Sequence, residues 1–155
     1  MTTLDNYLGI VKQEIDSGNV KVRRDAHIDY LALEQVMTDA SIVVGADKFE
    51  DRIINPLMQL SLYVKSQFST AVSIMKYFPF MDAQRKASFA SMVGKILEEK
   101  HALADHNRIY DPDYTLSTAS LKSDLFYAYL EVRQEYKKPN RKEIKELKKF
   151  LKGEK

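Results

Sequence analysis

Apolar residues recur at intervals of three and four along most of this chain, which is the spacing that places them on one face of an α-helix. A strand would instead require intervals of two. Only five Gly and four Pro interrupt the pattern over 155 residues. The sequence therefore predicts an all-α fold: a compact bundle of about five to six helices, with a long central helix and a basic amphipathic helix at the C-terminus.

The first two predicted helices are bounded by start and stop signals. The first begins at Thr2 or Thr3 and ends near Gly18, a residue suited to a left-handed cap. The second opens at Asp25 and ends before Gly45. Its predicted apolar residues are Ile28, Leu31, Ala32, Val36 and Met37. Residues 42–44 are open to two interpretations, the last turn of this helix or a short extended piece.

The most apolar stretch runs from residue 53 to residue 80 and predicts the long central helix. The polar and charged residues that interrupt it include Gln59, Lys65, Gln67 and Lys76. Because a charge at the centre of a membrane span costs about 2.5–3.5 kcal/mol, we interpret the stretch as a buried helix rather than a membrane span. Its predicted core stripe is Leu57, Leu60, Val64, Phe68, Ala71, Met75 and Phe78.

Two pairs of residues mark start sites near the beginning of this central helix. Asp47 followed by Glu50 has the spacing of a capping box. Asn55 before Pro56 offers a second start, because proline is tolerated where its missing N–H would be unpaired anyway. The helix is therefore predicted to be kinked near residue 56.

Pro79 ends the central helix, and Asp82 then caps a fourth helix that runs to Asn107. Gly94 within it has two interpretations. It permits the close approach of a neighbouring helix, or it is a tolerated glycine that costs about 1 kcal/mol against Ala. A turn-rich loop follows over residues 108–116.

Two further helices complete the predicted bundle. Ser117 or Ser120 opens the fifth, which ends at Pro139. Asn140 with Glu143 repeats the capping pattern and starts the sixth. The length predicts one domain over residues 1–155, with 139–155 as a basic helix that is either docked on the bundle or peripheral to it.

The composition narrows the compartment and the chemistry. The chain has no cysteine, which excludes a disulfide scaffold, thiol catalysis and the usual structural zinc sites. The first 15 residues contain neither a basic n-region nor a continuous apolar run, so no signal peptide is predicted. We therefore expect a cytoplasmic protein.

The charge is distributed unevenly along the chain. Residues 133–155 contain ten Lys or Arg and four Glu, a net charge of +6. The preceding part contains 14 basic and 18 acidic residues, a net charge of −4. The nearly balanced whole therefore consists of a mildly acidic body and a basic end.

We predict that the basic end binds RNA or DNA, because an array of cations neutralises phosphates and releases counterions. The predicted contact residues are Lys137, Lys138, Arg141, Lys142, Lys145, Lys148, Lys149 and Lys152. Tyr127, Tyr129 and Tyr136 lie just upstream and would stack on bases if they are exposed.

In a second interpretation the lysines only maintain solubility while a narrow apolar edge docks the helix on the bundle. Binding to an anionic membrane surface is a weaker third, because that edge is narrow and the chain has no Trp.

One cluster has the spacing of metal ligands. Glu98 and His101 form a Glu-x-x-His pair, which ferritin-like di-iron sites use twice, and Asp105 and His106 follow it. No second such pair occurs. The remaining ligands would have to come from the second predicted helix, whose candidates are Asp25, His27, Asp29 and Glu34. In the favoured interpretation His101 lies at the core boundary and the carboxylates lie on a solvated face, so we predict no metal and no cofactor.

The sequence also contains no glycine-rich phosphate loop, nucleophile elbow or His-Glu-x-x-His motif, which favours a non-enzymatic role. The leading hypothesis is a small helical subunit or accessory protein of a nucleic-acid-handling assembly. The alternative is a helical adaptor, inhibitor or oligomerisation protein that does not bind nucleic acid. Both involve a protein partner or self-association.

Overall fold

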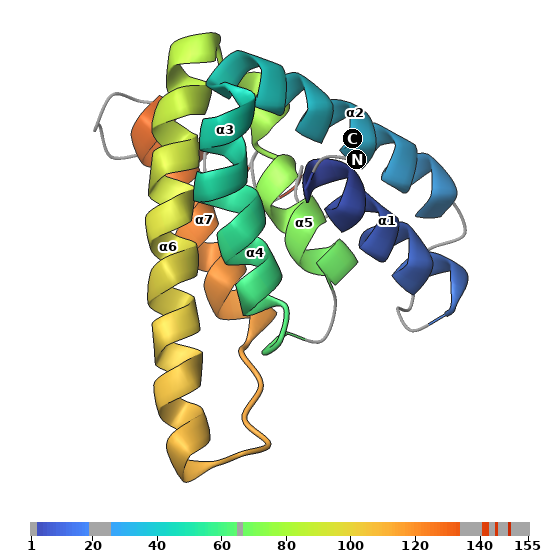
Figure 1. The fold of residues 1–155 in the computed structure, drawn as a ribbon. Helices are drawn as coiled ribbons and strands as arrows, with labels where there is room; N and C mark the ends of the chain where they lie inside the picture. The colour runs from blue at the N-terminus through green and yellow to red at the C-terminus, as the bar shows by residue number, and fades with distance from the viewer. Residues whose placement is uncertain are drawn as a thin grey trace.

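The computed structural model describes residues 3–18, 26–64 and 67–133, together with positions 141, 142, 145 and 149. Within this part of the chain all regular structure is helical and no strand is present, which confirms the all-α prediction (Figure 1). The elements are α1 (Thr3–Asp16), α2 (Ala26–Val44), α3 (Ala46–Phe49), the π-helical turn η1 (Glu50–Ile54), α4 (Asn55–Leu60), α5 (Gln67–Met75), the 3-10 turn η2 (Phe78–Phe80), α6 (Ala83–Tyr110) and α7 (Thr118–Arg133).

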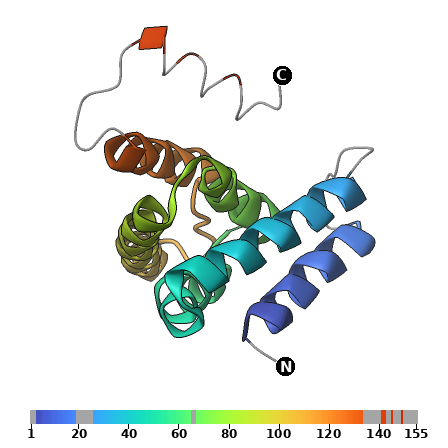
Figure 2. The same ribbon diagram turned by 90° about the horizontal axis from the view of Figure 1, so that it is seen from above.

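Helix α6 is the long helix of the bundle, at 28 residues. It contacts α7 along one side and η1 and α4 along another, and α2 crosses near its N-terminal end (Figure 1). Helices α1 and α2 lie side by side, with α5 between them and the α6–α7 pair (Figure 2). None of the described helices is long and apolar enough to cross a membrane.

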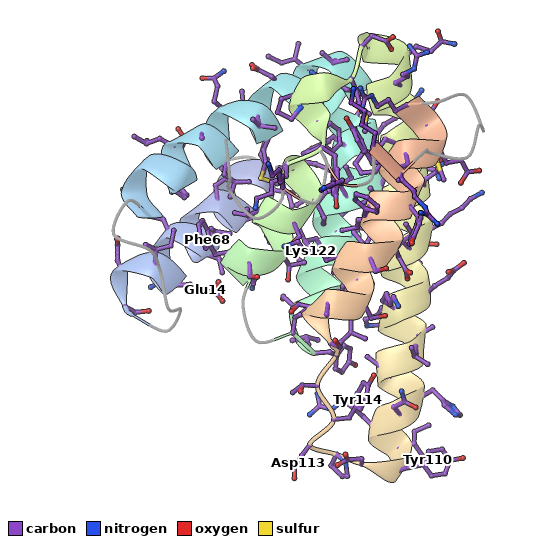
Figure 3. The ribbon with its side chains drawn as sticks, turned by 180° about the vertical axis from the view of Figure 1, so that it is seen from behind. Glu14, Phe68, Tyr110, Asp113, Tyr114 and Lys122 are labelled. Carbon is purple, nitrogen blue, oxygen red and sulfur yellow. The ribbon has the colours of Figure 1, made fainter. Side chains whose placement is uncertain are left out.

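The stretch from residue 53 to residue 80 is not one helix, contrary to the sequence prediction. Helix α4 ends in a turn in which the N–H of Tyr63 donates to the carbonyl oxygen of Leu60 at 2.9 Å. Helix α5 then starts anew at Gln67, because the Glu14 carboxylate of α1 accepts the backbone N–H groups of Gln67 and Phe68 at 3.0 and 3.1 Å (Figure 3). Two first-turn donors are thus satisfied from a residue more than 50 positions away. The predicted stripe is nevertheless largely buried, at Leu57, Leu60, Ala71, Met75 and Phe78.

The predicted capping box at Asp47 and Glu50 is also wrong. Helix α3 begins after Gly45, whose φ of 101° requires glycine, and it has no side-chain cap. Glu50 instead accepts the backbone N–H of Thr3 at 3.2 Å and so caps α1. Asn55 makes no side-chain cap either, since the backbone is helical at Ile54 and at Asn55. Residues 46–60 therefore continue through the π-helical turn η1.

The π-helical turn places two adjacent isoleucines in the core. A π turn is in effect one extra residue inserted into an α-helix, which rotates the residues that follow it. Ile53 and Ile54, at the end of this turn, are both fully buried. On the other side of this turn, a Cβ placed on Gly94 would lie 2.7 Å from the carbonyl oxygen of Arg52. The predicted close approach of a neighbour to Gly94 is confirmed.

Helix α2 buries only part of the predicted face. Met37 is fully buried and Val36 packs against the core, as predicted. Leu31 is 50% exposed and Ala32 is exposed, so their assignment to the core is wrong, and the side chain of Ile28 lies outside the described residues. The buried residues recur at Tyr30, Leu33, Met37 and Ala40. A run with apolar residues at neighbouring positions fits two helical faces, and the tyrosine stripe buries more area. Residues 42–44 form the last turn of α2, which decides between the two interpretations.

The described limits of α1, the start of α6 and the start of α7 at Thr118 are close to those predicted, whereas the predicted end of the fifth helix at Pro139 and the predicted cap at Asn140 lie outside the described residues. Helix α1 ends at Asp16, and Gly18 has the left-handed φ of 74°. The Asp82 carboxylate accepts the N–H of Arg85 at 2.8 Å and caps α6 as predicted, and this hydrogen bond lowers the pKa of Asp82. Helix α6 continues to Tyr110, three residues beyond the predicted end.

An aromatic cluster joins the segment after α5, including η2, to α6 and α7. The ring of Phe89 contacts those of Tyr77, Phe78 and Tyr129, with centroids 5.8, 5.2 and 6.5 Å away. Tyr77 is 1% exposed, and its hydroxyl has no hydrogen-bond partner among the described residues. By contrast, the hydroxyl of the fully buried Tyr7 donates to the carbonyl oxygen of Gln67 at 3.3 Å.

The contact at Gly94 predicts opposite effects for two glycine substitutions. Replacing a helix glycine by alanine normally stabilises by up to about 1 kcal/mol, and we expect this for Gly9→Ala, since a Cβ at Gly9 meets nothing within 4 Å. Gly94→Ala should lower the free energy of unfolding by about 1–3 kcal/mol because α6 and η1 must separate. Urea denaturation of both variants measures the difference. Stabilisation of equal size in both would contradict the close contact.

The unpartnered hydroxyl of Tyr77 predicts that Tyr77→Phe raises the free energy of unfolding by about 1 kcal/mol, because a buried polar group without a partner is removed. Tyr7→Phe should lower it by about 0.5–1.5 kcal/mol, because a hydrogen bond is lost. Urea denaturation near pH 7 measures both. If Tyr77→Phe destabilised as much as Tyr7→Phe, the hydroxyl of Tyr77 would have a partner after all.

The same two tyrosines also affect how the free energy of unfolding depends on pH above 10. Burial raises the pKa of Tyr77, aided by Tyr129, and burial raises the pKa of Tyr7, aided by Glu14. The stabilising effect of these neutral phenols is complete below pH 10 and is lost as the pH rises further, because the unfolded chain ionises first. Stability should therefore fall above pH 10, and less steeply in Tyr77→Phe.

Candidate functional site

Half of the predicted nucleic-acid contacts fall on described residues. Arg141, Lys142, Lys145 and Lys149 are helical and exposed. Arg141, Lys145 and Lys149 recur at every fourth position of the sequence, the spacing that places side chains on one face wherever a chain is helical. We call these three residues the C-terminal stripe. Lys137, Lys138, Lys148 and Lys152 lie outside the described residues.

The structure separates the tyrosines that were predicted to stack on bases if exposed. Tyr127 is 59% exposed and available for contact. Tyr129 is 1% exposed and belongs to the aromatic cluster, so it is not a stacking residue. Tyr136 lies outside the described residues.

The Glu98 and His101 pair does not belong to a metal-ligand cluster within the described residues. The described residues contain no group of three or more His, Asp or Glu side chains placed to hold a metal ion. His101 is half-buried, and its ring packs against that of Tyr63 with centroids 5.3 Å apart. Glu98 and Asp105 are exposed. The geometry is that of a histidine at the core boundary, as the favoured interpretation predicted.

Tyr63 ties the turn after α4 to the C-terminal half of α6. Its hydroxyl donates to the Asp105 carboxylate at 3.0 Å, which raises the pKa of Tyr63. The Arg108 guanidinium lies 5.1 Å from the centre of the Tyr63 ring and donates from Nε and Nη2 to the carbonyl oxygen of Pro112. The N–H of Leu116 donates to the carbonyl oxygen of Tyr63 at 2.8 Å. These contacts hold the loop 111–117 against the bundle.

The end of α6 and the following loop project beyond the other helices (Figure 3). Ile109 is 74% exposed and Tyr110 is 78% exposed. Among the large apolar side chains described, only Ile42, at 75%, is exposed to a similar extent or more. Asp111 and Asp113 are exposed beside them. The projection therefore combines two apolar side chains with two carboxylates.

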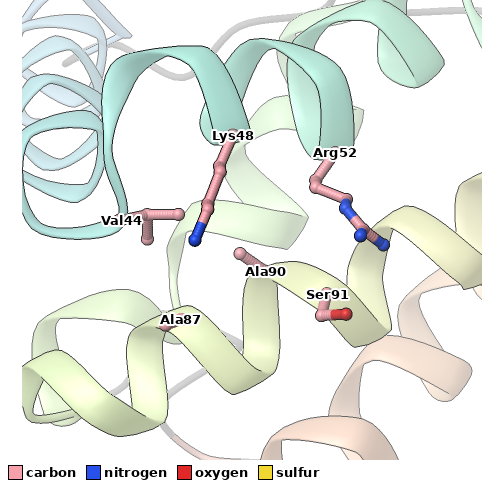
Figure 4. A pocket seen from close by; sticks show the side chains of 6 residues that line it. All are labelled: Val44, Lys48, Arg52, Ala87, Ala90 and Ser91. Atoms are coloured by element: carbon pink, nitrogen blue, oxygen red, sulfur yellow. The ribbon is translucent and has the colours of Figure 1, made fainter.

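A shallow groove of about 230 Å³ lies between α6 and the segment formed by α3 and η1. Its lining residues are Val44, Lys48, Arg52, Ala87, Ala90 and Ser91. The side chains of Lys48 and Arg52 extend from one wall toward the small residues of α6 on the other (Figure 4). We call this pocket the basic groove.

Neither cation of the basic groove has an ion-pair partner among the described residues. Two other cations of the body do: Arg85 pairs with Asp82, and Lys100 lies 3.0 Å from Asp124. Lys48 and Arg52 are four positions apart, and like charges at this spacing destabilise a helix by about 0.2–0.5 kcal/mol. Sequence reasoning missed this pair, because Asp47, Glu50 and Asp51 surround it in the sequence and give the segment a net negative charge.

Comparison with protein-family models, with curated proteins and with solved structures finds no match for this chain. The function is therefore argued from the residues themselves.

Proposed function

We propose that this protein is a small, non-enzymatic helical subunit or accessory protein of a nucleic-acid-handling assembly. Its basic C-terminal segment binds the phosphate backbone of RNA or DNA. The observation that supports this proposal most is the exposure of all four described cations of this segment: Arg141, Lys142, Lys145 and Lys149.

The physical basis is electrostatic. Each lysine or arginine that neutralises a phosphate releases condensed counterions, so affinity falls as the salt concentration rises. For duplex DNA the slope of log K against log salt is about −0.9 for each phosphate neutralised. Contacts of this kind carry little sequence information. The proposed role is therefore nucleic-acid binding with low sequence preference. Because residues 1–132 carry a net charge of −4, we place the binding at the C-terminal segment.

The stripe predicts a defined change in salt dependence. In Arg141→Gln/Lys145→Gln/Lys149→Gln the slope for duplex DNA should be smaller by about 2–3, and the Kd at low salt should rise at least tenfold. Fluorescence anisotropy with labelled single-stranded and duplex DNA and RNA at several salt concentrations measures both quantities and identifies the preferred polymer.

The matched control removes three charges from the helical body. Lys12→Gln/Lys95→Gln/Lys122→Gln has the same net charge as the first variant and should keep the wild-type slope within about 1 unit. Circular dichroism verifies that both variants remain helical. Equal loss of affinity in both variants would show that net charge alone, and not the C-terminal stripe, is responsible.

The exposed pair Ile109 and Tyr110 favours a second candidate function, a helical adaptor or oligomerisation protein. Large apolar side chains at the end of a projecting helix are suited to insertion into a partner, and Tyr is enriched among residues that dominate binding energy. The surrounding aspartates would provide a polar rim. In this alternative the protein does not bind nucleic acid.

Self-association through this projection is tested by sedimentation equilibrium over a range of protein concentrations. We expect a concentration-dependent oligomer that Ile109→Ser/Tyr110→Ser abolishes, because the apolar contacts are removed. The control Leu31→Ser/Tyr127→Ser replaces an aliphatic residue and a tyrosine that are exposed elsewhere, and it should associate normally. A wild-type protein that stays monomeric at every concentration would contradict self-association through the projection.

A further inference from the structure

We propose that the basic groove between α3–η1 and α6 binds the phosphate group of a phosphate ester. This inference is independent of the role proposed for the C-terminal segment, because it depends on Lys48, Arg52 and Ser91, which belong to the helical body. It assigns a second anion site to a part of the chain that carries no sequence motif for one.

The first argument is chemical complementarity. Arg52 offers a planar fork of donors that matches two oxygens of a phosphate, and Lys48 offers a compact charge. Ser91 on the opposite wall adds a hydroxyl, which donates one hydrogen bond. Since neither cation has an ion-pair partner among the described residues, a bound anion would relieve their mutual repulsion without breaking an existing ion pair.

The second argument is that small residues leave the groove open. Ala87 and Ala90 form the α6 wall together with Ser91, so no long side chain on that wall crosses to the cations (Figure 4). Arg52 and Lys48 therefore face a hollow rather than a packed surface. A single larger side chain at position 87 would fill it.

The third argument is that the walls are fixed. Gly94 lies three residues after Ser91 and brings the backbone of α6 against the carbonyl oxygen of Arg52. The spacing between α6 and η1 is therefore determined by backbone contact beside the groove and not by flexible side chains. A preformed site loses less conformational entropy on binding than one that must be ordered by its ligand.

The size of the groove limits the ligand. Pockets for drug-sized molecules are about 300–1,000 Å³, whereas this one is about 230 Å³ and shallow. It accommodates a phosphate and a short carbon unit, but not a whole nucleotide. Two sources share this chemistry, the terminal phosphomonoester of a small molecule and a phosphodiester within a nucleic-acid strand.

The test is an NMR titration of the isotopically labelled full chain at constant ionic strength. Glycerol 3-phosphate serves as the monoester probe and dimethyl phosphate as the diester probe. We expect saturable shifts of the amide resonances of Ala87, Ala90 and Ser91 with at least one probe. Stronger binding of glycerol 3-phosphate would assign a monoester, and binding of both probes with similar Kd would assign a phosphodiester. The absence of saturable shifts with either probe would overturn the proposal.

Variants separate the groove from general attraction of anions. Lys48→Gln/Arg52→Gln should raise the Kd at least tenfold, and Ala87→Leu should do so without any change of charge. Lys95→Gln, an exposed position on α6 that does not line the groove, should leave the Kd within about twofold. The variant with Gln at 141, 145 and 149 should also bind normally, which distinguishes this site from the C-terminal segment. Equal weakening by Lys95→Gln, or loss of the shifts in the C-terminal variant, would refute a site in the groove.

Discussion

The contact between Gly94 of α6 and the carbonyl oxygen of Arg52 is the constraint on which the bundle depends. It allows the backbone of α6, the longest described helix, to lie directly against the backbone of the π-helical turn. Only glycine permits this approach, because any Cβ at position 94 would clash with the carbonyl oxygen. The same turn contains the buried Ile53 and Ile54 together with Arg52, whose side chain extends toward α6 beside that of Lys48 from α3. The packing of the core at η1 and the shape of the basic groove therefore both depend on the close contact between α6 and η1.

Two carboxylates show how strongly the fold relies on caps from distant parts of the chain. Glu14 of α1 caps α5, and Glu50 of η1 caps α1, so the first helix both gives and receives a cap. Such caps stabilise a helix end by about 1 kcal/mol each. They also make the helices mutually dependent, because neither α1 nor α5 has these partners until the other segments are in place.

These caps explain which parts of the fold the sequence predicts. The apolar period identifies the helices, the cap at Asp82 and most of the core stripe, because those depend on neighbours within about a turn. The break after Leu60 and the failure of the capping box at Asp47 depend on Glu14 and Thr3, which lie far away in the sequence. The assignment of Leu31 to the core is wrong for a related reason: Leu31 and Tyr30 can both pack in a core, and only the position of the partner helices determines that Tyr30 is the buried one.

The sequence predicts one of the two candidate anion sites but not the other. A run of lysines in the C-terminal segment is visible in the sequence because its charges are contiguous. The basic groove is not visible, since Lys48 and Arg52 lie among acidic neighbours and their partner wall of Ala87 and Ser91 is about 40 residues away. Only the folded arrangement places small residues opposite two cations without ion-pair partners.

The two basic regions differ in the kind of recognition they allow. Long side chains on a helical stripe adapt to many phosphate arrangements, so they favour affinity and salt dependence over selectivity. A groove with fixed walls instead selects by size and by the number of phosphate oxygens it reaches. Because residues 1–132 carry a net charge of −4, a polyanion gains little by spreading over the body. Both proposals therefore place binding where cations are concentrated or walled, at the C-terminal stripe and at the basic groove.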